Sequence, residues 1–197
     1  MNLEVTMPGA IILKNFTQAA LRLRDDARGA SAVEFAFILP LMLTLFFGLI
    51  EVTSGVEADR KVTLTARALS DVISQATTVT DTQITDSFSA IANVMSPYNT
   101  STIKSVVSEV KINGSGQATV AWSKANSNAT ARPTNSSVTI PTALAVPNTY
   151  LICSEVQYTY KPAVNWVIST AGVNLSEQFF TRPRQSNCVL YGTTSCP

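Results

Sequence analysis

Residues 35–50 form an apolar stretch without a charged side chain, and this feature restricts the possible folds more than any other. Counted from Ala30, the stretch reaches 21 residues and has Glu34 as its single charge. A helix of about 20 apolar residues spans the hydrocarbon core of a bilayer. A buried core helix is the alternative, but no polar face divides the stretch as in an amphipathic helix. We therefore predict a transmembrane helix.

The charges on either side of this stretch predict its orientation. Residues 1–29 carry four basic and three acidic side chains, and three of the basic ones lie within eight positions of Gly29. After the stretch, Glu51, Glu57 and Asp59 come before the first basic residue. By the positive-inside rule, the N-terminus lies in the cytoplasm and the large C-terminal part lies outside.

Removal as an ordinary secretory signal peptide is a separate possibility. Such peptides have a short basic segment, an apolar core and a cleavage site made of small residues. Here the segment before the core is about 30 residues long and contains acids, and only residues 53–55 are small after it. The match is poor, so we expect the helix to remain as an anchor.

Composition excludes several classes of site. The 197-residue chain has no histidine, and its three cysteines form no Cys-x-x-Cys pair. A Ser-His-Asp triad, a Cys-His dyad and the usual zinc sites are therefore absent. A net charge of +1 implies no large basic surface for nucleic acid. We expect no enzyme, no metal and no cofactor; an anchored enzyme or solute-binding domain remains the weakest alternative.

Beyond residue 50, the hydrophobic period first indicates helices. Apolar residues recur every three or four positions up to about residue 77, so the helix is expected to continue, with its stripe interrupted at Asp59. A second, short helix follows, with Asp81 or Thr82 as its cap, and it ends before Pro97.

The period then changes to two, which is typical of strands. Residues 106–112 and 118–122 predict a hairpin around the turn at residues 113–116, with Val120 and Trp122 on one face.

The rest of the chain is expected to form loops and strands. Residues 124–139 are expected to form a mobile loop, 149–160 a long strand and 174–181 the last strand, whereas residues 163–173 fit either a helix or a loop. The predicted fold class is α+β, a long transmembrane helix that continues into a small head with a short antiparallel sheet.

The most informative motif lies at the start of the apolar stretch. Gly29 is followed, after four residues, by Glu34 and Phe35. This G-x-x-x-x-E-[FY] pattern resembles the processing site of type IV prepilins, most closely those of the Tad (tight adherence, Flp) system. The ending Phe-Gly-Leu-Ile-Glu at residues 47–51 is similar to TadE/TadG-like minor pseudopilins. Weaker similarity to that family continues in the C-terminal part.

This resemblance implies a processed pilus component. A prepilin peptidase would cleave between Gly29 and Ala30 on the cytoplasmic side. The corresponding glutamate of assembled filaments meets the N-terminal amine of a neighbouring subunit, so the resemblance assigns Glu34, with Phe35 beside it, to subunit docking. A carboxylate in an apolar stretch costs about 2.5–3.5 kcal/mol when it is inserted in a membrane, which favours a partner. A glutamate that only reaches water at the helix end is the alternative.

The resemblance also implies a location and partners. The chain would be a single-pass protein of the bacterial inner membrane, with a cytoplasmic N-terminus and a periplasmic C-terminal domain, and it could enter the pilus. Its partners would be the prepilin peptidase, other pilins and pseudopilins, the Tad inner-membrane machinery and lipid. The alternative is an anchored periplasmic assembly module that stays outside the filament. The expected parts are a leader (1–29), a transmembrane helix (30–51), a periplasmic helical segment (52–100) and a β-rich head (101–197).

The proline and the cysteines carry further expectations. Pro40 removes a backbone donor inside the helix, so we expect a kink or a locally loosened turn there, or else a tolerated membrane proline. Cys153, Cys188 and Cys196 lie in the exported part, where one disulfide is expected. We favour Cys153–Cys188 over Cys188–Cys196, and three free thiols are the remaining alternative.

Several aromatic residues allow two interpretations. They could form an adhesive surface, but core positions are the simpler explanation for them. They are Trp122, Tyr150, Tyr158, Tyr160 and Trp166.

Overall fold

The computed structural model describes residues 28–162, 172–192 and 195–196. The chain divides into two units, one that ends at Leu49 and one that begins at Ile50. Nearly all of the expected leader, most of the segment 163–173, and Trp166 lie outside the described residues.

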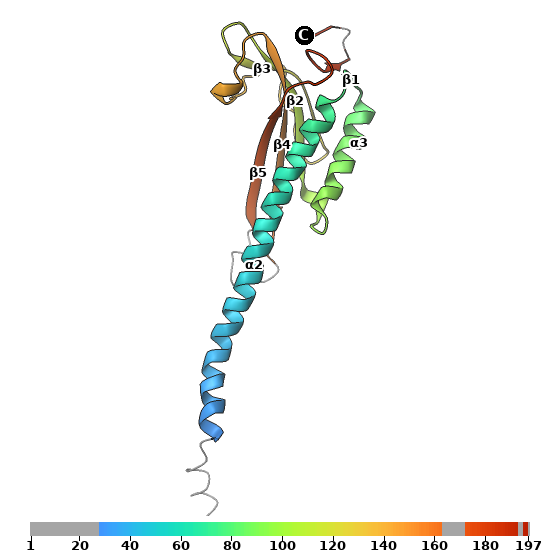
Figure 1. The fold of residues 1–197 in the computed structure, drawn as a ribbon. Coiled ribbons are helices and arrows are strands. Elements are labelled where there is room, and N and C mark those ends of the chain that lie inside the picture. The colour runs from blue at the N-terminus through green and yellow to red at the C-terminus, as the bar shows by residue number, and fades with distance from the viewer. Residues whose placement is uncertain (1–27, 163–171, 193–194, 197) are drawn as a thin grey trace, which may run out of the picture. The chain divides into compact units, whose positions relative to one another are not determined.

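The described part of the first unit is the opening section of helix α2 (Arg28–Ser74) (Figure 1). Its large apolar side chains from Val33 to Leu49 are all exposed, with exposed fractions of 37–80%. A helix that is apolar on every side needs an apolar surrounding. By length and composition α2 is able to cross a membrane, which is compatible with a single-pass anchor.

Pro40 lies inside α2, and the helix is continuous through it. The missing N–H of a proline leaves the carbonyl four residues earlier, that of Ala36, without its helical donor. The Thr44 hydroxyl donates to the Pro40 carbonyl oxygen at 2.8 Å, a contact that turns this polar side chain back onto the helix. Pro40 therefore does not end the helix, and its role in packing stays a prediction.

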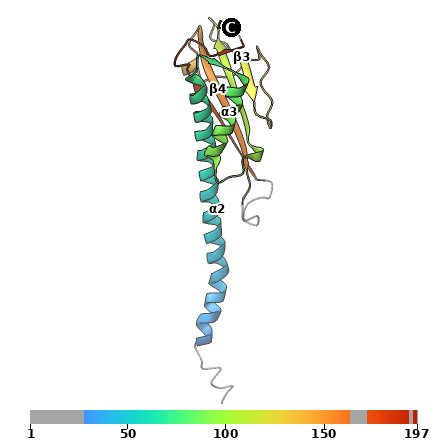
Figure 2. The same ribbon diagram turned by 90° about the vertical axis from the view of Figure 1, so that its right-hand side faces the viewer.

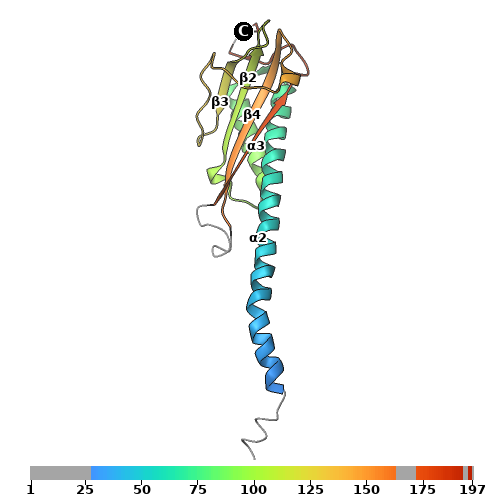
Figure 3. The ribbon, with the colours of Figure 1, turned by 90° about the vertical axis from the view of Figure 1, so that its left-hand side faces the viewer.

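The second unit is a four-stranded antiparallel sheet with helices on one face (Figures 2 and 3). The strand order is β3–β2–β4–β5. The strands are β2 (Lys104–Ile112), β3 (Ala118–Ala125), β4 (Thr149–Tyr160) and β5 (Val173–Thr181). Residues 50–74 of α2 and helix α3 (Asp81–Ala92) supply the covering helices. The predicted α+β class, a long apolar helix followed by a small head with an antiparallel sheet, is confirmed.

Short elements connect these parts. Strands β1 (Thr78–Val79) and β6 (Leu190–Tyr191) pair in parallel, which the sequence did not predict. Three single 3-10 turns are η1 (Asn93–Met95), η2 (Thr100–Thr102) and η3 (Thr142–Leu144).

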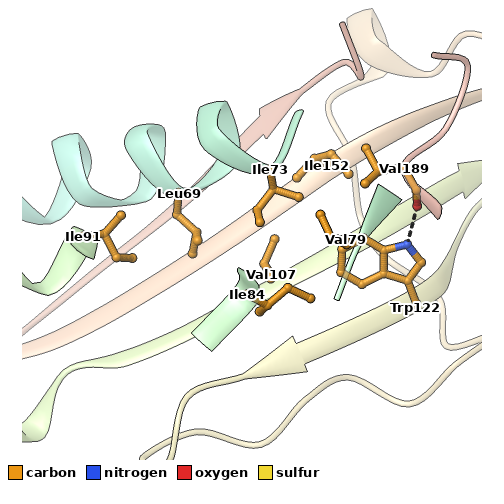
Figure 4. Close-up of a cluster of buried hydrophobic side chains, with 9 residues drawn as sticks. All are labelled: Leu69, Ile73, Val79, Ile84, Ile91, Val107, Trp122, Ile152 and Val189. Atoms are coloured by element: carbon orange, nitrogen blue, oxygen red, sulfur yellow. Dashed lines mark hydrogen bonds between the residues drawn. The ribbon is translucent and has the colours of Figure 1, made fainter. Parts of the chain in front are cut away.

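Residues 50–74 of α2 are amphipathic, unlike the residues before them. Buried side chains recur at three- and four-residue intervals, as predicted, and Asp59 lies on the exposed side without interrupting the helix. Leu69 and Ile73 pack into a cluster with Ile152 of β4 and Trp122 of β3 (Figure 4). A second cluster is formed by Ala58, Val62, Ala66, Met95, Ile103, Val156, Tyr158 and Tyr160. The helix is thus held to the sheet along its inner stripe.

The cap of α3 is Thr80, so the expected caps Asp81 and Thr82 are wrong. Thr80 has an extended backbone, and its hydroxyl accepts the Gln83 N–H at 3.3 Å. The Gln83 side chain in turn accepts the Thr80 N–H at 2.9 Å, which completes a capping box. Asp81 is the first helical residue, and its carboxylate pairs with Lys124 at 2.8 Å.

The predicted hairpin is present, but the placement of Trp122 beside Val120 is wrong. Trp122 lies opposite Glu109, whereas Val120 lies opposite Val110, because the register shifts between these two residues of β2. A bulge adds one residue to a strand and reverses the side-chain alternation beyond it. Trp122 therefore faces the helices, while Val120 faces the other side of the sheet.

The face of the sheet away from the helices is partly covered by the connection between β3 and β4. Val138 of this connection is buried in a third cluster with Val110 and Val120. An isolated antiparallel bridge joins Ser137 to Thr119 of β3. The expected loop is therefore attached to the sheet through an apolar anchor.

We predict that Leu69→Ala lowers the free energy of unfolding by about 2–5 kcal/mol, because the fully buried side chain leaves a cavity in the cluster. Chemical denaturation of the full chain in detergent micelles, followed by tryptophan fluorescence, measures the change. Leu64→Ala is the matched control on the same helix, since Leu64 is 52% exposed and should cost under about 1 kcal/mol. Equal losses in both variants would contradict the packing described here.

Candidate functional site

The residues of the prepilin-like motif all lie in the first turns of α2. Gly29, Ala30, Glu34 and Phe35 are helical and exposed. A Cβ placed on Gly29 would meet no atom within 4 Å. Since a helical glycine costs roughly 0.5–1 kcal/mol relative to alanine, packing gives no reason for a glycine at this position. A requirement outside the fold, such as recognition by a peptidase, would give one.

Glu34 and Ala30 lie on the same side of the helix. They are four positions apart, which corresponds to about one turn and a rise of about 6 Å. No described ion pair or side-chain hydrogen bond involves Glu34, whereas the apolar side chain of the neighbouring Phe35 is 59% exposed. The helix therefore presents one carboxylate on an otherwise apolar surface.

A second polar site lies inside the head, at Glu109 in the middle of β2. Glu109 is fully buried, and its Oε1 accepts the Val189 N–H at 2.5 Å. The Val189 carbonyl oxygen accepts the indole N–H of Trp122 at 2.8 Å (Figure 4). Two side chains of the sheet thus hold both backbone groups of one residue in the C-terminal segment.

Burial controls the charge of Glu109. Loss of hydration raises the pKa of its carboxyl to about 7, although the hydrogen bonds from Val189 and Trp122 act in the opposite direction. Its other oxygen, Oε2, is buried and has no hydrogen-bond partner among the described residues. The Glu109 carboxyl that accepts the Val189 N–H therefore changes its charge near pH 7. The attachment of the C-terminal segment is expected to depend on pH for this reason.

Further contacts hold the C-terminal segment beyond Val189. The Leu190 N–H donates to the Thr77 carbonyl oxygen at 2.9 Å, next to the β1–β6 pairing. The Tyr191 hydroxyl contacts the Asp81 carboxylate at 2.9 Å, and Lys124 lies 4.5 Å from the Tyr191 ring centroid. The segment is therefore an integral part of the head.

Glu109 was not predicted from the sequence as a site residue. Val107 belongs to the same face of the strand and is buried with the helix residues Leu69 and Ile84. An apolar residue two positions before Glu109 was the signal that this face is covered.

The disulfide joins Cys188 to Cys196, so the favoured Cys153–Cys188 pairing is wrong. Neighbouring residues of a strand point to opposite faces of the sheet. Ile152 packs with Val189 on the helix side, whereas Cys153 lies in the cluster on the other side. The sheet therefore separates Cys153 from the C-terminal segment. Burial raises the pKa of the free Cys153 thiol to about 12, which makes it a poor nucleophile.

Most of the aromatic residues singled out from the sequence are core residues. Trp122, Tyr158 and Tyr160 are each at most 7% exposed. The Tyr160 hydroxyl donates to the buried Glu51 at 2.7 Å, and the ring of Tyr98 meets that of Tyr160 edge-on at 6.0 Å. These contacts join the first residues of the second unit to the end of β4.

The part of the chain that the structure describes holds no group of three or more Cys, Asp or Glu residues that could bind a metal ion.

A family model described as "TadE-like protein" matches residues 29–70. The matched range begins at Gly29, contains Glu34 and Pro40, and ends within α2. No curated protein and no solved structure matches the chain. The match confirms, for this segment, the resemblance that the glycine–glutamate motif indicates.

We predict that the stability of the head falls as the pH rises from about 4.5 to 7, by up to about 3 kcal/mol from Glu109 alone. The reason is that the folded state retains the Glu109 proton up to about pH 7, whereas the unfolded chain loses it near the ordinary glutamate pKa of 4.5. Below pH 4.5 the contribution is fully present.

Denaturation across this pH range tests the prediction, with Glu109→Gln expected to remove this part of the pH dependence. Glu57→Gln, at an exposed position of α2, serves as the control and should keep the wild-type profile. A Glu109→Gln profile identical to the wild type would refute the assignment.

Proposed function

Because its residues 29–70 form a segment of the TadE-like family, we propose that this chain is a minor pseudopilin that takes part in the biogenesis of the Tad pilus. The observation that carries the proposal is an apolar helix, exposed on every side, with a single carboxylate one turn after a Gly-Ala bond. A lipid bilayer and the apolar helices of other pilus subunits are two surroundings that would cover such a helix. The partners would be the pilus components and the lipid.

The proposed topology follows from the charges beside the helix. The N-terminal flank would lie in the cytoplasm, and the head with its Cys188–Cys196 disulfide would lie in the periplasm. Disulfides persist in oxidising compartments, which supports this placement. The chain would act as a structural component and a substrate for processing, not as an enzyme.

The proposed processing is hydrolysis of the Gly29–Ala30 bond by the prepilin peptidase. Water adds across the peptide bond, so Gly29 gains a carboxylate and Ala30 gains an amine. Gly29 is exposed, and a Cβ placed on it meets no described atom within 4 Å, which supports access by a peptidase.

The proposed role of Glu34 is to select the position of a neighbouring subunit. A carboxylate on an apolar helix costs about 2.5–3.5 kcal/mol in a membrane if it has no partner. The new amine of Ala30 on an adjacent subunit would supply that partner. Because Ala30 and Glu34 lie on one side of the helix, offset along its axis, each subunit offers one acid and one amine. Head-to-tail packing pairs both, and a shifted register leaves a charge unpaired.

We predict that N-terminal mass spectrometry on protein from native membranes finds a mature chain that begins at Ala30. Gly29→Leu should stay uncut, with an unchanged thermal melt, because Gly29 is exposed and a Cβ at this position meets no described atom within 4 Å. A chain that retains Met1 in the wild type would refute the processing. In that case, if the protein is also absent from sheared pili, the result would favour an anchored assembly module that stays outside the filament.

We predict that Glu34→Ala is still cleaved but abolishes or strongly reduces piliation, because the amine of the neighbour loses its partner. Immunoblots of sheared pili and of membranes measure the two steps separately. Glu57→Ala, which removes an exposed carboxylate from the same helix, is the matched control and should assemble normally. Normal piliation in Glu34→Ala would exclude the docking role.

A further inference from the structure

The head has an open sheet edge along β5. This strand is the last in the order of the sheet. All nine of its residues pair with β4 and with no other described strand. The second edge is different, because Ser137 bridges to Thr119 of β3 there. An edge strand presents unpaired N–H and C=O groups at alternate residues, and these groups can pair with another extended chain. No proline interrupts β5.

A hollow lies beside this edge and is lined by residues of β5, of α2 and of the segment after β5. Its volume is about 590 Å³. It is lined by Leu64, Arg67, Ala68, Asp71, Phe179, Phe180, Thr181 and Arg184. Leu64 is 52% exposed although it lies on the same helix as the buried core stripe. An apolar surface and an open strand edge therefore occur side by side.

The charges of the hollow favour an acidic partner. The guanidinium of Arg67 lies 5.1 Å from the Phe179 ring centroid, and no described carboxylate forms an ion pair with it. Arg184 forms an ion pair with Asp71, so these two charges cancel. The hollow is left with one uncompensated positive charge, on Arg67. This charge lies over an aromatic ring beside the strand edge.

We propose that the free edge of β5 and the adjoining hollow bind an extended acidic segment of another protein by strand addition. Main-chain hydrogen bonds to β5 would supply the pairing, an apolar side chain would contact Leu64 and Phe179, and a carboxylate would contact Arg67. A second copy of this chain, paired edge to edge, would give a symmetric dimer, and the test below distinguishes that outcome. The proposal is independent of the pilus function, since it rests on the head alone.

The test uses a fluorescein-labelled ten-residue peptide and the full chain in detergent micelles. Every second residue of the peptide is threonine, and the residues between the threonines are valine and glutamate by turns. The valine and glutamate side chains therefore share one face of the strand. Fluorescence anisotropy should show saturable binding. Two peptides serve as controls, one with lysine in place of glutamate and one N-methylated at alternate residues, and neither should bind.

Variants of α2 locate the binding surface. We expect Arg67→Glu to weaken binding of the acidic peptide at least about tenfold, which corresponds to about 1.4 kcal/mol. Arg60→Glu, an equal charge change at another exposed position of α2, should leave binding within about twofold of the wild type. Leu64→Asp provides a second variant in the hollow and should also weaken binding. Unchanged thermal melts show that the variants remain folded.

Three results would overturn the proposal. They are no binding of the acidic peptide, equal binding of the lysine or N-methylated peptide, and unchanged binding by Arg67→Glu. A dimer in analytical ultracentrifugation that Leu64→Asp dissociates would instead assign the surface to a second copy of the chain. None of these readouts involves piliation, so failure here and failure of the pilus function are distinguishable.

Discussion

The structure depends on one helix that must satisfy two different surroundings. Up to Leu49, α2 is apolar on all sides and finds no cover within its own unit. From Ile50 onwards, only one stripe of the same helix is apolar, and that stripe packs on the sheet through residues such as Leu69 and Ile73. Hydrophobic burial thus fixes the second part within the head, whereas no described residue of the first unit covers the first part. The proposed function follows from this difference between the two parts of α2.

The head stabilises itself with apolar contacts and uses few charges in its interior. Among the described residues of the head, Glu51 and Glu109 are buried carboxylates, and Glu109 accepts the Val189 N–H beside the cluster that contains Trp122. A buried carboxyl that holds a backbone segment fixes that segment in one position, since any other position leaves the carboxyl without a donor. Glu109 thus attaches the C-terminal segment in a specific position, although burial costs its carboxyl the hydration that it has in water. Glu109 lies on the inner strand β2, whereas the edge strand β5 pairs with β4 alone among the described strands, so the interior and this edge of the sheet differ in how their polar groups are used.

The sequence predicted those features that have a local cause. Hydrophobic period located α2, α3 and the four long strands, and the motif at Gly29 indicated the resemblance that the match of a TadE-like family model to residues 29–70 supports. The errors concern interactions between distant residues. The bulge that turns Trp122 towards the helices depends on its partner strand, and the sheet that separates Cys153 from Cys188 exists only after folding. The parallel pairing of β1 with β6 joins segments more than 100 residues apart, for which no local pattern exists.

The C-terminal segment also determines when the head can fold. Val189 is the last residue of its core cluster along the chain, and it completes contacts with Glu109 and Trp122 that lie about 70 to 80 residues before it. Contacts between such distant residues form late and slow down folding. Until the chain has been extended past this point, Glu109 lacks the backbone donor that it binds in the folded head. The core of the head therefore closes only after the segment around Val189 has been synthesised, so the strands made first wait for a partner that comes some 70 to 80 residues later.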